Sequence, residues 1–313
     1  MRFVEVPSDV ARAGLRALKT VCATDGVISP LEASFLDGVQ RHIMRSTFDL
    51  DALAPITGEE LARAIPPGEL RERVVGGMVI ASCIDGDASP VEMAVVERLA
   101  SALEVAPAIL ATGRHLAADR LMLARIDIGR RALPGFKMGG VLREEGLPGL
   151  IRQILPMLGV ANDKTAARYR ALGDSPAGTL GRAYFDFITG NQFSFPGEKY
   201  AGPEIIVAHD ILHVLGGYGT TAEEEVQVAA FQAGCHDENH FHALLFVIAQ
   251  FHLGIAMTPV STAERLKADP EAMVKALARG AKVSRDMWSD FDPWQHFARP
   301  LDEVRRELNI EPR

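Results

Sequence analysis

The sequence predicts an all-α protein, and three observations lead to that fold class. Apolar residues recur three and four positions apart over residues 31–44 and 91–103, the spacing that places them on one face of a helix. A Ser-Pro-x-Glu segment marks the start of both stretches and matches a capped helix start. Further along, an apolar stretch ends in Gly216-Gly217 and a Thr-Ala-Glu segment follows, which is typical of one helix ending and another beginning.

The first part of the chain contains an internal repeat. The segment Asp25-Gly-Val-Ile-Ser-Pro-Leu-Glu32 returns sixty residues later as Asp85-Gly-Asp-Ala-Ser-Pro-Val-Glu92. In each copy the glycine lets the chain turn, and the Ser and Glu residues predict a complete capping box. Asp25, Asp85 and Asp87 could instead bind a metal, but the spacing of a calcium loop is absent, so the structural interpretation is favoured.

The paired Asp-Gly turns between helices resemble the TerB-like (tellurite-resistance) helical domain over about residues 8–120. The resemblance implies a helical bundle, which we place at residues 1–124. Residues 125–164 are rich in glycine and proline and predict a connector with short helices. Residues 165–313 then form a second helical domain.

Composition excludes several classes of protein. The 313 residues carry a net charge of -8, which argues against nucleic acid as a partner because phosphate binding needs a basic face. Cys22, Cys83 and Cys235 are widely spaced and odd in number, so we expect no disulfide framework and a cytoplasmic location. The segment Met1–Pro7 lacks an apolar signal core, and no apolar run reaches the ~18 residues of a spanning helix.

The segment His209-Asp210-Ile-Leu-His213 is the strongest candidate for a functional site. On a helix, at about 100° per residue, its three polar side chains project to roughly one side. Glu225 follows His213 after eleven residues, on the second helix, so two histidines and two carboxylates could converge. Such nitrogen and oxygen donors suit one divalent metal, zinc first and otherwise iron or manganese.

A hydrogen-bonded pair of histidines on a helix surface is the alternative interpretation of this segment. The flanking residues favour the metal, because residues 205–207, 211–212 and 214–215 are all apolar and predict a buried helix. Buried histidines and carboxylates need partners, and a metal ion is an efficient one.

The His-Asp-x-x-His segment and the distant Glu resemble the signature of the coenzyme Q (ubiquinone) biosynthesis family that carries a zinc-type site. The likeness covers about residues 165–313 and includes residues 178–187 and 299–310. It implies that His209, His213 and Glu225 bind the metal. Asp210 is then a fourth ligand or a catalytic proton-transfer group.

The same resemblance implies oxidative decarboxylation of a prenylated benzoquinone precursor, with the metal polarising the ring oxygens. It also implies a peripheral position at the inner membrane and contacts with other quinone-biosynthesis proteins. Zinc has no redox chemistry, so the oxidation needs iron, another cofactor or a direct reaction of oxygen with the ring. The apolar stretch Phe241–Met257 is the best candidate wall for a prenyl channel, although a core helix is the ordinary interpretation.

Three other functions fit parts of the sequence. A non-catalytic scaffold would bind a prenyl lipid or other isoprenoid and organise quinone-biosynthesis enzymes, with the metal only bracing two helices. A metallohydrolase is suggested by the likeness to His-Glu-x-x-His, although Asp210 is one methylene shorter than the usual general base. A tellurite or metal stress-response role would follow from the first domain, and any exposed apolar helix face would allow a homodimer.

A second His-Asp-x-x-His segment runs from His236 to His240. Its inner residues are polar and no Glu follows at the matching distance. We therefore predict a solvated turn there, with an accessory metal site as the alternative.

Overall fold

The computed structural model describes residues 6–236, 240–258 and 261–313, with residues 133–137 described by their backbone alone. Over these ranges the chain forms fifteen α-helices and no β-strand, so the all-α prediction is confirmed. In the same ranges no helix is long and apolar enough to cross a membrane. Residues 1–5 of the predicted signal-free N-terminus and residues 237–239 of the second His-Asp-x-x-His segment lie outside the described part.

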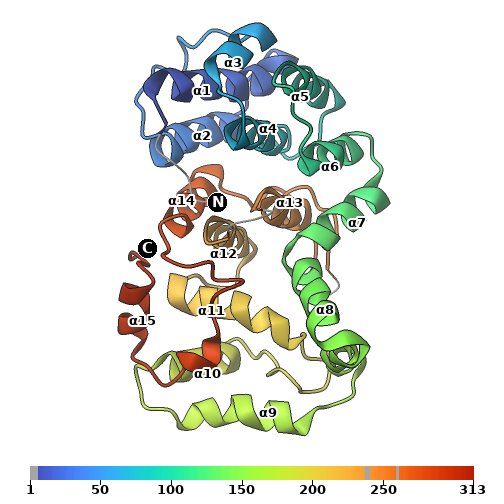
Figure 1. The fold of residues 1–313 in the computed structure, drawn as a ribbon, viewed down its shortest axis with the longest axis vertical. Coiled ribbons are helices and arrows are strands. Elements are labelled where there is room, and N and C mark those ends of the chain that lie inside the picture. Colours follow the sequence, from blue (N-terminus) through green and yellow to red (C-terminus); the bar gives the residue numbers. More distant parts are fainter. Residues whose placement is uncertain (1–5, 237–239, 259–260) are drawn as a thin grey trace.

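The first six helices pack together at one end of the molecule (Figure 1). Helix α1 contacts α2, α3, α4 and α5. A short π-helical turn, η2 (Val39–Ile43), follows α2 directly. The helices are α1 (Ser8–Cys22), α2 (Pro30–Gly38), α3 (Gly58–Ala64), α4 (Glu69–Ala81), α5 (Pro90–Ala102) and α6 (Ala108–Ala117).

The two copies of the repeat form the predicted turns but differ at their caps. Gly26 and Gly86 both adopt left-handed φ angles, of 94° and 96°. Ser29 and Glu32 form a complete capping box at the start of α2. At the start of α5 the Ser89 hydroxyl accepts the backbone N–H of Glu92, at 3.4 Å, but the Glu92 side chain does not return the bond. The second capping box is therefore only half formed.

The predicted connector is helical over most of its length. Helix α7 (Leu121–Arg131) crosses the predicted boundary after residue 124, and α8 spans Leu133–Ile154. Gly146 interrupts α8 with a φ of 67°, a left-handed angle at which glycine is favoured, so two shorter helices meet there. Pro148 lies just beyond this break, where a proline is tolerated because a new helix is starting.

Helices α11, α13 and α14 pack around α12, and α10 lies on the far side of α11 (Figure 1). Helix α14 packs on α12 and also on α2 and η2, while α13 contacts α4 and α7. Buried apolar residues from both halves of the chain consequently belong to one continuous core. The helices are α9 (Asp163–Arg170), α10 (Leu180–Gly190), α11 (Val207–Gly216), α12 (Ala222–Gly234), α13 (His240–Phe251), α14 (Pro270–Gly280) and α15 (Leu301–Glu307).

Two glycines allow α12 and α14 to approach until their backbones touch. A Cβ atom on Gly280 would lie 1.9 Å from the Phe231 carbonyl oxygen, and one on Gly234 would lie 2.2 Å from the Leu277 carbonyl oxygen. No real Cβ atom tolerates such distances. These glycines therefore fix the position of α12, the helix that carries Glu225.

The apolar stretch expected over residues 241–257 forms a shorter helix inside the core. Helix α13 ends at Phe251, and each of its residues is buried or half-buried. The Gln250 side chain then stabilises the following loop, because its oxygen accepts the backbone N–H of Met257 at 2.6 Å. This packing counts against α13 as the wall of a lipid channel and favours the core interpretation.

Candidate metal centre

Helix α11 presents His209 and His213 on one face. Its opposite side is anchored in the core by Ile211, Leu212 and Leu215. The helix ends where Gly217 adopts a left-handed φ of 71° and its N–H bonds the His213 carbonyl oxygen. The glycine stop predicted from the sequence is confirmed.

Helix α12 begins close to the end of α11 and carries Glu225 in its first turn. The Thr221 hydroxyl caps this helix by accepting the backbone N–H of Glu224, at 3.3 Å. The partial positive charge of a helix start stabilises a carboxylate there. The loop before α12 is tied to α10, because the Thr220 hydroxyl donates to the Asn191 side-chain oxygen at 3.0 Å.

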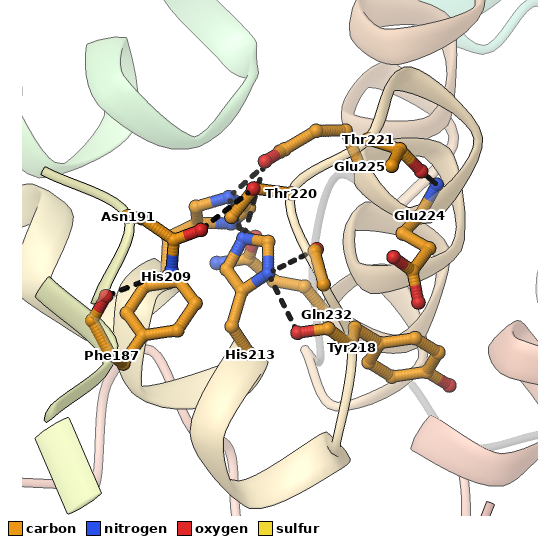
Figure 2. Close-up of polar contacts among 11 residues, drawn as sticks. Phe187, Asn191, His209, His213, Tyr218, Thr220, Thr221, Glu224, Glu225 and Gln232 are labelled. Atoms are coloured by element: carbon orange, nitrogen blue, oxygen red, sulfur yellow. Dashed lines mark hydrogen bonds and ion pairs between the residues drawn. The ribbon is translucent and has the colours of Figure 1, made fainter. Parts of the chain in front are cut away.

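The side chains of His209, His213 and Glu225 converge in the space between these helices (Figure 2). The two Nε2 atoms lie 3.1 Å apart. Glu225 places one oxygen 3.4 Å from His209 Nε2 and the other 3.5 Å from His213 Nε2. The part of the chain that the structure describes contains one group of three or more such donor residues within 4.8 Å of one another, and it is this one.

A second set of contacts orients the two imidazole rings. His209 Nδ1 donates to the Gln232 side-chain oxygen at 2.9 Å, and His213 Nδ1 donates to the Gly219 carbonyl oxygen at 2.9 Å. Phe187 also stacks on the His213 ring, with 5.1 Å between ring centroids. With each Nδ1 occupied as a donor, both Nε2 atoms face the Glu225 carboxylate, and each can bind a metal ion when it carries no proton.

The spacing of the donor atoms fits a metal ion. In a tetrahedral site with bonds of about 2.0–2.2 Å, neighbouring donor atoms lie about 3.3–3.6 Å apart. An octahedral site brings them to about 3 Å. The three observed separations cover this range. The residues therefore fit zinc as well as iron or manganese, and two histidines with one carboxylate leave coordination positions open.

Charge coupling within the centre changes the pKa of each group. Burial lowers the pKa of His209, but the hydrogen bond and charge of Glu225 outweigh burial and raise it to about 9. Burial and the neighbouring His209 lower the pKa of His213 to about 4. Burial raises the pKa of Glu225, but its bond to His209 outweighs that effect and lowers it. Without a metal, a proton on His209 thus neutralises Glu225, and metal binding must release that proton.

The centre is accessible from one side. The His213 side chain is 2% exposed, whereas those of His209 and Glu225 are 22% and 24% exposed. His209 and Glu225 are therefore partly open to solvent while His213 stays enclosed.

Asp210 lies outside the convergent group. Its carboxylate is not among the atoms within 4.8 Å of one another. Burial raises the pKa of Asp210 to about 7, and its charge in turn helps to raise the pKa of Tyr184 on α10. The Tyr184 hydroxyl is buried and has no hydrogen-bond partner in the structure. Asp210 thus belongs to a polar region beside the centre, facing α10.

Sequence reasoning missed Gln232 and Tyr184. Gln232 follows Glu225 by seven residues, which places it two turns later on the same face of α12. A glutamine within the otherwise apolar end of that helix was the available signal. For Tyr184 the sequence offers no comparable signal, because its position beside Asp210 depends on how α10 packs.

The second His-Asp-x-x-His segment behaves differently from its prediction. His236 is buried and its Nδ1 lies 2.8 Å from an Asp286 carboxylate oxygen, so a solvated turn is wrong for this residue. The inner residues 237–239 lie outside the described part of the chain.

Comparison of the chain with models of protein families and with curated proteins gives no match.

Proposed function

We propose that His209, His213 and Glu225 bind one divalent metal ion, with zinc as the first candidate and iron or manganese as the others. The observation that carries this proposal is the convergence of three donor atoms with orienting contacts on both histidines. The fit of the donor set to catalytic zinc and to mononuclear iron sites supports it further.

On this basis we propose that the chain acts in ubiquinone biosynthesis and removes a carboxylate from a prenylated benzoquinone precursor. The support is the likeness of the His-Asp-x-x-His-x(11)-Glu segment to that family, together with the meeting of three of its residues in space. A bound metal would supply Lewis-acid chemistry at the ring oxygens. The oxidative part needs an oxidant, for which we propose molecular oxygen.

Asp210 is the proposed proton-transfer group. With molecular oxygen as oxidant, a hydroxybenzoate ring would give a quinone, carbon dioxide and water. One oxygen atom would replace the carboxylate on the ring carbon and the other would leave as water, so the protons of the ring hydroxyl and the carboxyl group must be carried to that water. A carboxyl group whose pKa is raised to about 7 holds a proton near neutral pH and can release it.

Metal analysis tests the first part of the proposal. We expect about one equivalent of zinc, iron or manganese in the purified protein, and its loss in a His209→Ala/His213→Ala double mutant. His115→Ala, a change on α6 away from the centre, is the matched control and should keep the metal. Equal metal content in the double mutant, or no metal after reconstitution, would contradict the proposal.

Asp210→Asn separates catalysis from a scaffold role. If Asp210 transfers a proton, the variant keeps its metal but loses decarboxylation of the carboxylated prenyl-ring substrate by about 100-fold or more. A scaffold whose metal only braces α11 and α12 would keep its function in this variant. Release of labelled carbon dioxide is the measurement.

A further inference from the structure

A basic pocket lies where η2, α14 and the C-terminal residues meet. It has a volume of about 520 Å³. Six of its fourteen lining residues are lysine or arginine and one is acidic, whereas the chain as a whole carries a net charge of -8. The pocket is therefore positively charged although the whole chain is negatively charged, and this local charge indicates an anionic ligand.

Irregular backbone brings cations from the N-terminal half to the pocket. Arg41 and His42 lie on the π-helical turn η2, and Arg45 follows it with a left-handed φ of 47°. π-helical turns and left-handed residues other than glycine are costly and occur often at binding sites. Here they place three basic side chains opposite α14.

Part of the positive charge is already neutralised. Arg41 pairs with Asp37 and Glu271, which accounts for its charge. Among the described residues, the other pairs at the pocket are His42 with Glu271, Lys282 with Glu311 and Arg313 with Glu224.

Two cations at the pocket make no polar side-chain contact within the described residues. Arg45 and Lys275 are exposed and form no hydrogen bond or ion pair within the described ranges of the chain. Removing either side chain would therefore break no internal contact. Both are free to approach a ligand.

The inner wall of the pocket is fixed in advance. The buried Arg279 donates to the Gly216 carbonyl oxygen at 2.9 Å and to the Tyr218 hydroxyl at 3.1 Å. The Tyr218 ring is also covered by the guanidinium group of Arg313, 4.9 Å from the ring centroid. A rigid wall with free cations at the entrance reduces the entropy lost when a ligand binds.

We propose that this pocket binds a phosphate-bearing ligand through Arg45 and Lys275. The two positive charges on these free side chains match the charge of about -2 on a phosphate group near neutral pH. Arginine and lysine are the side chains that recognise phosphate, and the volume leaves room for an organic part beside it. The site does not depend on the metal centre or on the function proposed above.

Calorimetry with inorganic pyrophosphate at low ionic strength is the first test. An Arg45→Gln/Lys275→Gln double variant should bind at least ~10-fold more weakly than the full wild-type chain, because charge-assisted hydrogen bonds are lost. An Arg63→Gln/Lys164→Gln double variant removes the same charge from exposed positions elsewhere and should bind as the wild type does.

A second arm separates a free ligand from a lipid headgroup. Co-sedimentation uses vesicles of phosphatidylcholine with phosphatidic acid, compared with phosphatidylcholine alone. If the Arg45/Lys275 variant loses pyrophosphate binding, the ligand is a free phosphate compound. If instead the wild type binds the phosphatidic acid vesicles and only the Arg45/Lys275 variant fails to bind them, the ligand is a lipid phosphate. Binding to neither probe, or equal weakening in both double variants, would overturn the proposal.

Discussion

Enclosed carboxylates meet other ionisable groups at several places in this molecule, and two of these places differ in kind. Between α11 and α12, Glu225 faces two imidazoles whose Nδ1 atoms are already bound. Between the two copies of the N-terminal repeat, Glu32 and Glu92 are 3% and 4% exposed and act on each other. The metal centre offers both nitrogen and oxygen donors to a cation. The Glu32–Glu92 place instead brings two carboxyl groups together.

The two places differ in the groups that surround each carboxylate. Asp25 and Asp85 accept backbone N–H groups of their own turns, from Val27 and Asp87, each at 3.0 Å. One oxygen of Glu92 is buried and has no hydrogen-bond partner among the described residues. Burial, and then the charges of Asp85 and Glu32, raise the pKa of Glu92 to about 8. Buried carboxylates alone therefore favour a proton, and neutral nitrogen donors are what make the other place suitable for a metal.

Glu225→Gln should give the largest effect. Removing a partner of a metal ligand already costs about 10- to 100-fold in affinity, so loss of a ligand itself should cost more than ~100-fold. Glu92→Gln is the matched change at the other place and should leave metal affinity unchanged. Competition with a chromophoric chelator measures both. An equal loss of metal affinity in the two variants would contradict the distinction between the metal centre and the Glu32–Glu92 place.

Glu92 should make stability fall as pH rises. The pKa of Glu92 is about 8 in the folded chain and 4.5 ordinarily, so between these values the folded state binds more protons than the unfolded one. The contribution of Glu92 to the free energy of unfolding is complete below about pH 4.5 and is lost as the pH rises toward 8. The free energy of unfolding should differ by on the order of 2 kcal/mol or more between these two pH values. Guanidinium unfolding at several pH values measures it.

Glu92→Gln tests the origin of that slope. A glutamine resembles the protonated acid, so the variant should be more stable than the wild type at pH 8 and should show a flatter profile. Glu72→Gln, at an exposed position on α4, should keep the wild-type slope. A slope unchanged by Glu92→Gln would assign the pH dependence to other groups.

Short-range patterns predicted much of the fold and the centre of the candidate site. The spacing of His209 and His213, the glycines after them and the cap before Glu225 are local features, and all three form as predicted. The length of α13 could not be predicted in this way. Its apolar pattern continues past Phe251, but Gly254 adopts a left-handed φ of 73° there.

Features that depend on packing were out of reach of the sequence. The half-formed box at Glu92 exists because its side chain lies near Glu32, sixty residues away in the chain. The basic pocket likewise combines η2, α14 and the C-terminal residues, none of which predicts the others. Predictions from short sequence patterns failed where a segment distant in the sequence contacts the side chain in question.

The smallest expected effect concerns Gln232, the partner of His209. Gln232→Leu keeps the volume of the side chain but removes the oxygen that holds Nδ1 at 2.9 Å, so His209 can rotate or change tautomer. We expect metal affinity to fall ~10-fold with little change in stability, since Gln232 already has one buried nitrogen without a partner. Gln232→Glu keeps an acceptor and should restore or strengthen binding. If both variants bind metal as the wild type does, packing and not Gln232 holds the His209 ring. The metal centre would then differ from the Glu32–Glu92 place only in its nitrogen donors.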